Sequence, residues 1–220
     1  MNRRLALRAL AILGIGGTLL AAFLATVVVM RDRVAERAPQ SGPQLVEPGS
    51  VPIGGPFSLV DHRGRPVTEG DFGGRYLLVF FGFTNCPDIC PTTLADIARV
   101  MSLLGDDAGA VQPLFVSVDP ARDTPQRLSE YLKAFDAGIV GLTGTAEQVA
   151  AMAEAFRTYY GRQPADADGY YLVDHQANTY LMTPENQYLT HFSYGTSPEV
   201  MAKTVREVIA KHGRPKRNSR

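Results

Sequence analysis

Cysteine is scarce in this chain, with two residues among 220, and histidine is nearly as scarce, with four. Two cysteines are too few for a disulfide-stapled scaffold, for a four-cysteine zinc site or for an iron–sulfur cluster held by four thiolates. No repeat with a period of about 20–50 residues is present, which excludes solenoids and propellers. Apolar residues make up 45% and charged residues 20%, a mixture that excludes wholesale disorder. The length predicts one globular domain with an appendage.

The formal net charge is zero, but the charges are unevenly distributed along the chain. Residues 38–210 hold 20 acidic and 11 basic side chains, whereas both ends of the chain are basic. The acidic body argues against nucleic acid as a partner, because phosphate binding needs a basic groove. Residues 213–220 are expected to be a solvated basic tail, and contact with an anionic lipid or an acidic partner is the alternative.

A long apolar run lies near the N-terminus, where residues 9–30 contain no charged side chain. A helix of about 20 residues crosses the hydrocarbon core of a bilayer, so this run predicts a transmembrane anchor. Three arginines precede the run and predict that residues 1–8 stay cytoplasmic. A cleaved signal peptide is the alternative, although its apolar region is usually shorter. In a bacterium, an anchor predicts a single-pass protein of the cytoplasmic membrane with its C-terminal domain in the periplasm or outside the cell.

Residues 31–54 are expected to be a linker because they are rich in proline and show no apolar period. The domain that follows is expected over residues 55–212, and its pattern is that of an α/β protein. Continuous apolar runs predict strands buried on both faces, and apolar stripes with capping residues predict helices. The expected strands are 57–60, 66–68, 76–81, 111–118, 139–142, 170–174, 178–183 and 188–192, and the expected helices are 91–104, 125–135, 146–156 and 198–212. This order predicts a thioredoxin-like mixed sheet with helices on both faces.

Both cysteines fall in one short segment, Phe83-Thr84-Asn85-Cys86-Pro87-Asp88-Ile89-Cys90-Pro91, at the carboxyl end of the most apolar strand. Ligands bind at this edge of open α/β sheets, and a helix N-terminus lowers the pKa of nearby thiols. Cys86 and Cys90 are close enough in sequence to form a disulfide or to bind one metal ion. Two thiolates favour Cu(I), which accepts two or three soft ligands, whereas zinc requires four ligands. A structural disulfide in an oxidising compartment is the plainer alternative.

The remaining candidate residues are ambiguous when taken by themselves. His62, His175 and His191 lie in the body of the chain, and His175, which ends an apolar strand, is more typical of a core histidine than of a ligand. Asp119 and Asp123 flank a loop after the second buried strand. These two side chains could order that loop or contact a partner, and capping of the turn and helix explains them equally well.

Three segments resemble, in the same order, the signatures of the Sco/SenC family of copper chaperones. They are Gly82-Phe83-Thr84-Asn85-Cys86-Pro87-Asp88-Ile89-Cys90-Pro91, Ser117-Val118-Asp119-Pro120-Ala121-Arg122-Asp123-Thr124-Pro125 and Tyr171-Leu172-Val173-Asp174-His175. The resemblance covers roughly residues 55–212, behind an anchor of the kind that such proteins usually have. It implies a thioredoxin fold and one copper ion, Cu(I) or Cu(II), bound by Cys86, Cys90 and His175. It also implies delivery of that copper to the dinuclear copper centre of cytochrome c oxidase.

The first hypothesis is therefore a copper-transfer protein, a binding module rather than an enzyme. Its expected partners are the copper-centre subunit of cytochrome c oxidase and, in addition, other copper carriers or thiol reductants. The alternative is a thiol–disulfide oxidoreductase that keeps the copper-site cysteines of its partner reduced, with Cys86 and Cys90 as the redox-active pair. The usual thioredoxin spacing places two residues, not three, between the cysteines. A peroxiredoxin-like peroxidase has only the fold in its favour. His175 discriminates between the first two hypotheses, because an oxidoreductase has no evident need for it.

Overall fold

The computed structural model describes residues 23, 26, 43–135 and 137–215. The anchor expected at 9–30 lies outside the described residues except at positions 23 and 26, as do the start of the linker and the end of the basic tail. No helix in the described part of the chain is both long enough and apolar enough to cross a bilayer. The chain divides into two units, Met1–Gly42 and Pro43–Arg220, and the strands described below belong to the second.

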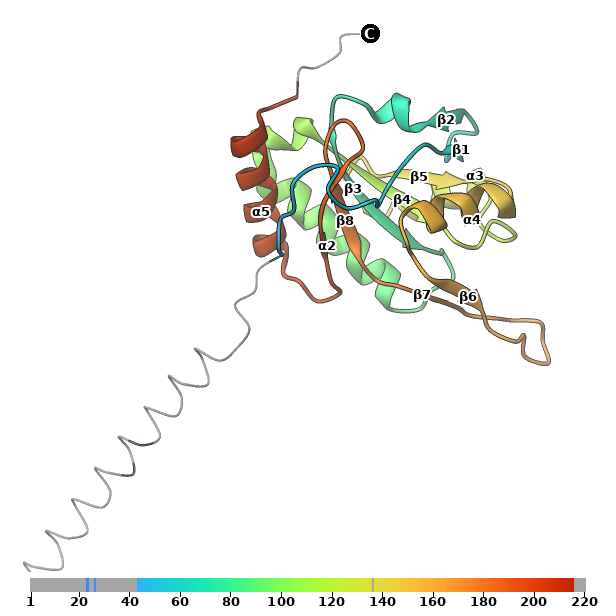
Figure 1. Cartoon of the computed structure of the whole chain (residues 1–220). Coiled ribbons are helices and arrows are strands. Elements are labelled where there is room, and N and C mark those ends of the chain that lie inside the picture. The colour runs from blue at the N-terminus through green and yellow to red at the C-terminus, as the bar shows by residue number, and fades with distance from the viewer. Residues whose placement is uncertain (1–22, 24–25, 27–42, 136, 216–220) are drawn as a thin grey trace, which may run out of the picture. The chain divides into compact units, whose positions relative to one another are not determined.

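A seven-stranded mixed sheet forms the centre of this second unit (Figure 1), with the order β2-β1-β5-β4-β3-β8-β9. Its strands are β1 (Ser58–Asp61), β2 (Pro66–Thr68), β3 (Tyr76–Gly82), β4 (Val111–Ser117), β5 (Val140–Thr143), β8 (Thr179–Met182) and β9 (Tyr188–Phe192). The three central strands β5, β4 and β3 are parallel, and the outer pairs are antiparallel. Every residue of β3 and β4 is buried, which confirms the prediction that both are buried strands.

Helices cover both faces of the sheet, as predicted. They are α2 (Ile89–Leu104), α3 (Pro125–Leu132), α4 (Ala146–Ala155) and α5 (Pro198–His212), with short 3-10 turns at Glu69–Phe72 and Gly105–Ala110. Helices α2 and α5 pack against each other on one face, beside β3 (Figure 1). Helix α4 covers the opposite face, where Phe156 directly after it contacts Phe81 of β3. The side chains of Thr124, Thr145 and Ser197 cap α3, α4 and α5, and each cap lies where the sequence predicts it.

The strand expected at 170–174 is the main difference between expectation and structure. The strand β7 (Val173–His175) starts later and does not join the main sheet. It pairs antiparallel with β6 (Tyr160–Arg162), and the two form an arm that extends beyond the sheet (Figure 1). A three-residue strand is too short to show an alternation of apolar and polar residues, so the sequence pattern does not predict β6. The arm carries His175, which pairs with Tyr160.

The described part of the expected linker lies against the domain. The backbone N–H of Val46 donates a hydrogen bond to the carbonyl oxygen of Leu189 at 2.9 Å. Val51 and Ile53 pack against the core, and the N–H of Gly54 donates to the carbonyl of Ala155 at 2.9 Å. Residues 46–54 are therefore part of the packed unit.

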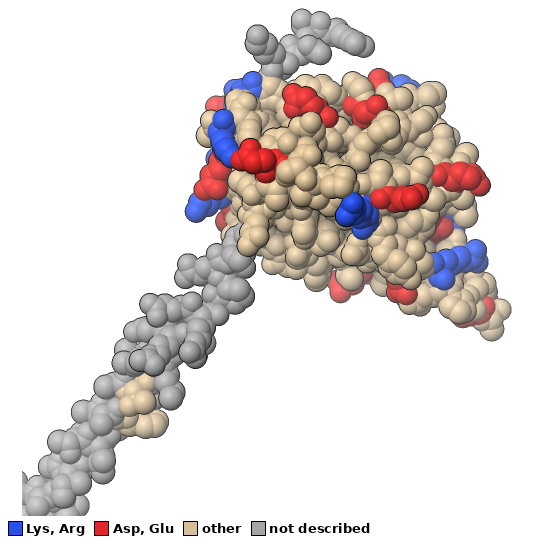
Figure 2. Space-filling model, in the orientation of Figure 1, with Lys and Arg blue, Asp and Glu red and all other residues tan. Residues whose placement is uncertain are grey.

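Acidic and basic side chains are interspersed over the face shown in Figure 2. Ion pairs such as Lys203–Glu207 and Lys211–Glu47 join exposed side chains, and such pairs contribute little to stability because water screens them. The apolar core, and not surface charge, therefore holds the domain together.

Candidate metal centre

The two cysteines lie where β3 leads into α2. Cys86 is in the connecting loop, and Cys90 is in the first turn of the helix, which begins two residues earlier than the sequence predicts. Asp88 occupies the N-cap position, but its side chain makes no capping hydrogen bond. The sulfur of Cys86 accepts a hydrogen bond from the backbone N–H of Cys90 instead, at 3.5 Å. The first sulfur therefore satisfies one of the N–H groups that a helix leaves free at its start.

His175 reaches the cysteines from the β6–β7 arm. Its Nε2 lies 3.4 Å from the Sγ of Cys90, and its Nδ1 lies 3.1 Å from the carbonyl oxygen of Gln176. Because a carbonyl oxygen only accepts hydrogen bonds, this contact requires a proton on Nδ1. The rings of Phe80 and Phe83 meet the imidazole edge-on, with centroid distances of 6.0 and 5.9 Å, and hold its orientation.

The ligating atoms of Cys86, Cys90 and His175 all lie within 4.8 Å of one another. Within the described residues, this is the one group of three or more Cys, His, Asp or Glu side chains placed to hold a metal ion. Cys90 is fully buried, while Cys86 and His175 are half-buried, so the group is reached from solvent on their side. The other two histidines of the body lie elsewhere: Nδ1 of His62 accepts from the backbone of Gly141, and Nδ1 of His191 contacts the hydroxyl of Tyr188.

The two thiols share one proton between them. A hydrogen bond from the Cys90 thiol lowers the pKa of Cys86 to about 3. The same hydrogen bond, together with burial, raises the pKa of Cys90. Near neutral pH, Cys86 is therefore a thiolate and Cys90 a thiol, and neither is in a disulfide. A metal ion that binds both sulfurs has to displace the remaining proton.

The donor set fits copper better than it fits zinc or an iron–sulfur cluster. Two thiolates and one imidazole make a soft, three-coordinate site of the kind that Cu(I) accepts. A structural zinc site requires a fourth ligand, and the group described here has three. The geometry thus brings to the two sulfurs an imidazole that the residue pattern alone would assign to the core.

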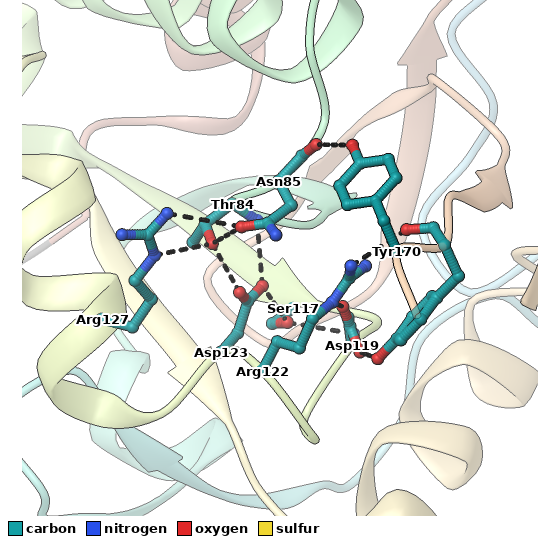
Figure 3. A network of polar contacts seen from close by, with 9 residues as sticks. Thr84, Asn85, Ser117, Asp119, Arg122, Asp123, Arg127 and Tyr170 are labelled. Carbon is teal, nitrogen blue, oxygen red and sulfur yellow. Dashed lines mark hydrogen bonds and ion pairs between the residues drawn. The ribbon is translucent and has the colours of Figure 1, made fainter. Parts of the chain in front are cut away.

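A network of polar contacts lies beside the cysteine loop (Figure 3). Its centre is Asp123, whose carboxylate is fully buried and accepts hydrogen bonds from Thr84 and Ser117. Of the three roles that the sequence leaves open for Asp123, these contacts favour ordering of the loop. Arg122 and Tyr171 join the network through Asp119, which forms an ion pair with Arg122 and accepts a hydrogen bond from the hydroxyl of Tyr171. The sequence does not predict these contacts, because an arginine in a loop and an aromatic residue in a strand look the same without them.

The chain is similar to known proteins over most of its length. The family model described as SCO1/SenC matches residues 46–210. The bovine protein SCO2 homolog, mitochondrial, is 42% identical over 158 residues, which make up 71% of this chain and 59% of that protein. Protein sco1 of Schizosaccharomyces pombe is 39% identical over 180 residues, which make up 80% of this chain and 67% of that protein. The chain thus spans only about three fifths of the bovine relative.

A solved structure shows the same fold. The crystal structure of Arabidopsis thaliana ScoI with copper bound is 39% identical to this chain, with a TM-score of 0.68. The match covers 72% of this chain and 99% of the solved one.

Proposed function

The chain belongs to the SCO1/SenC family, and we propose that it is a copper-transfer protein that binds one copper ion through Cys86, Cys90 and His175. The observation that carries the proposal is the convergence of two sulfurs and one imidazole nitrogen within 4.8 Å. The related plant protein with copper bound supports copper as the ion. Two sulfur ligands suit Cu(I), and the imidazole adds a ligand that matters more for Cu(II).

The exposure of the site suits transfer of the ion better than permanent storage. Cys90 is buried at the back of the group, whereas Cys86 and His175 are half-buried. An acceptor's ligands can therefore approach from the side of Cys86 and His175 and replace them one at a time. Oxidation of both cysteines to a disulfide, with transfer of two electrons to an oxidant, would remove both sulfur ligands and so make binding depend on redox state.

The acceptor that we propose is the copper-centre subunit of cytochrome c oxidase, with other copper carriers or thiol reductants as further partners. The three ordered signature segments support this acceptor through the family that they resemble. We also propose that residues 9–30 anchor the chain in the cytoplasmic membrane, with the domain on the outer side. The support for the anchor is the charge-free apolar run.

One observation favours a second function. The pKa of Cys86 is lowered to about 3, and a second thiol, Cys90, lies in the first turn of the helix that follows. A stabilised thiolate next to a second cysteine is the arrangement of a thiol–disulfide oxidoreductase. In this second function Cys86 attacks a partner's disulfide, and Cys90 then displaces the reduced partner as the internal disulfide forms.

Metal analysis of the full chain tests the copper proposal. The chain is purified in detergent, reduced, and offered Cu(I) anaerobically. We expect one copper per chain for the parent and loss of stoichiometric binding for the Cys86→Ser, Cys90→Ser double variant. The variant His191→Ala, which removes a surface histidine away from the site, is the control and should bind as the parent does. Stoichiometric Cu(I) in the double variant would overturn the proposal.

A further inference from the structure

The loop that follows β4, residues 119–123, contacts both of the separate segments that supply the proposed copper ligands. It is a tight turn, in which the backbone N–H of Asp123 donates to the carbonyl of Asp119 at 2.9 Å and the N–H of Arg122 donates to the same oxygen at 3.1 Å. The cysteines come from the β3–α2 connection, and the histidine comes from the arm that ends in β7. No residue of the loop is one of the three proposed ligands.

On the cysteine side, the loop acts through Asp123. One oxygen of its carboxylate accepts from the hydroxyl of Thr84 at 2.6 Å, and the other accepts from the backbone N–H of Thr84 at 3.0 Å and from the hydroxyl of Ser117 at 2.6 Å. Thr84 stands two residues before Cys86. Because Asp123 is fully buried, water does not compete for these bonds, and the carboxylate holds the start of the cysteine loop against the end of β4.

On the histidine side, the loop acts through Asp119 and Arg122. The hydroxyl of Tyr171 donates to Asp119 at 2.8 Å, and Arg122 donates to the carbonyl oxygen of Tyr171 at 2.9 Å. The guanidinium of Arg122 also lies 3.6 Å from the centre of the Tyr171 ring and forms an ion pair with Asp119. Tyr171 stands four residues before His175, at the point where the chain enters β7.

The aromatic ring of Phe83 links the same arginine to the imidazole. The guanidinium of Arg122 lies over the ring of Phe83 at 5.8 Å from its centre, and the ring of Phe83 in turn packs edge-on against His175. Phe83 itself belongs to the loop that carries Cys86, whose N–H donates to the Phe83 carbonyl at 3.3 Å. Figure 3 shows Arg122 and Asp123 directed toward the two different segments.

We propose that residues 119–123 form a positioning clamp that sets the place of His175 relative to Cys86 and Cys90. Asp123 fixes the cysteine side, and Asp119 with Arg122 fixes the histidine side. The inference rests on the proposed copper binding, because the clamp matters only where the three ligands act together. Groups that orient metal ligands without touching the metal change affinity by about 10–100-fold when they are removed.

Two conservative variants separate the two sides of the clamp. Tyr171→Phe removes only the hydroxyl that donates to Asp119. Thr84→Val replaces with a methyl group the hydroxyl that donates to Asp123 and accepts from Arg127. Tyr180→Phe is the matched control, since it removes a buried tyrosine hydroxyl that contacts Thr158 at 2.8 Å in the core. All three are made in the full chain, purified in detergent.

The expected result is a split between the two oxidation states of copper. For Tyr171→Phe we expect Cu(II) affinity to fall about tenfold or more and the Cu(II)–thiolate absorption to shift, with Cu(I) affinity nearly unchanged. For Thr84→Val we expect affinity for both ions to fall about tenfold, because the sulfurs are ligands in both states. Tyr180→Phe should leave both affinities and the absorption at their parental values. Copper binding by both site variants that equals that of the control would overturn the clamp.

Hydrogen exchange in the metal-free chain tests the clamp independently of copper. Tyr171→Phe should accelerate exchange in residues 171–176 and leave 83–90 unchanged, and Thr84→Val should do the reverse. Uniform acceleration, as expected for the control, would contradict the clamp. If the parent chain binds no copper, the proposed function fails, while the exchange pattern still decides whether the loop positions the two segments.

Discussion

Gly82 and the sulfur of Cys90 occupy one small space at the end of β3. A Cβ atom at position 82 would lie 2.7 Å from the Cys90 Sγ and 2.8 Å from Cε2 of Phe115. Cys90 and Phe115 are both fully buried, so neither can move into solvent. The missing side chain at position 82 is therefore what allows the first turn of α2 to place a sulfur directly against the sheet.

Gly82→Ala should harm both stability and copper binding. Overpacking of a close-packed interior costs about 1–3 kcal/mol, and relief of the contact requires the Cys90 sulfur to move away from Cys86 and His175. Denaturant unfolding and competition for Cu(I) measure the two effects. Gly109→Ala is the control, because Gly109 is exposed and nothing lies within 4 Å of its added Cβ. Parental Cu(I) affinity in Gly82→Ala would show that this contact does not set the position of the sulfur.

The parts of the fold that could be predicted from the sequence are those with a local physical cause. The central strand β3 is buried on both faces and has a continuous apolar run, and α3, α4 and α5 are capped by residues whose side chains accept hydrogen bonds nearby. The cysteine pair could be placed at the sheet edge for the same reason, since it directly follows the most apolar strand.

The parts that could not be predicted depend on contacts between distant segments. Tyr160 and His175 pair between two strands of three residues each, which are too short to show a pattern, so residue pattern alone suggests a core histidine. A buried carboxylate such as Asp123 and an ordinary helix-capping aspartate look alike after a strand and before a helix. Position 82 requires glycine because the sulfur of Cys90 packs against it. The sequence does not show this contact, because it does not give the shape of the β3–α2 turn that brings the two residues together.

Cys86 should remain reactive in mild acid. Because the hydrogen bond from Cys90 lowers the pKa of Cys86 to about 3, the thiolate fraction is already close to one at pH 5 and cannot rise much further by pH 8. An ordinary cysteine with a pKa of about 8.5 gains roughly a thousandfold in thiolate over that interval. Alkylation of the reduced, metal-free chain by iodoacetamide, followed at the Cys86 peptide, should therefore change little from pH 5 to pH 8.

The control for this prediction is Cys90→Ala, which removes the first cause of the lowered pKa. Its Cys86 pKa should rise, so its alkylation rate at pH 5 should fall well below its rate at pH 8. A steep rise with pH in the parent chain would contradict the assignment of the shared proton to Cys90.

The N-terminal segment should determine where the chain is found in the cell. A charge-free apolar run at 9–30 predicts that the full chain stays in the membrane fraction after carbonate extraction. A chain that begins at Pro43 keeps the contact between Val46 and Leu189 and should be soluble and folded. Deletion of residues 1–8 is the control, since it leaves the apolar run intact and should keep the chain in the membrane. Release of the full chain into the soluble fraction would exclude the anchor.

His175→Ala separates copper transfer from thiol–disulfide exchange. The imidazole contributes the nitrogen ligand to a site with two sulfurs, and this ligand matters more for Cu(II) than for Cu(I). We therefore expect nearly complete loss of Cu(II) binding and weaker Cu(I) binding, both measured by competition with chelators of known affinity. The disulfide between Cys86 and Cys90 should still form, because the β3–α2 turn and not the imidazole sets its geometry. His191→Ala is the matched histidine control and should bind both ions as the parent does.

In cells, the His175→Ala variant should accumulate to near-normal levels while the oxidase copper centre fails to assemble. The reason is that the half-buried imidazole packs against Phe80 and Phe83 at the edge of the core and not inside it. Its loss should therefore weaken copper binding more than it lowers the stability of the fold. Suppose instead that the variant binds Cu(II) like the parent and supports assembly, while loss of disulfide reduction in the cysteine variants produces the defect. In that case His175 has only a packing role, and the low pKa of Cys86 serves an oxidoreductase.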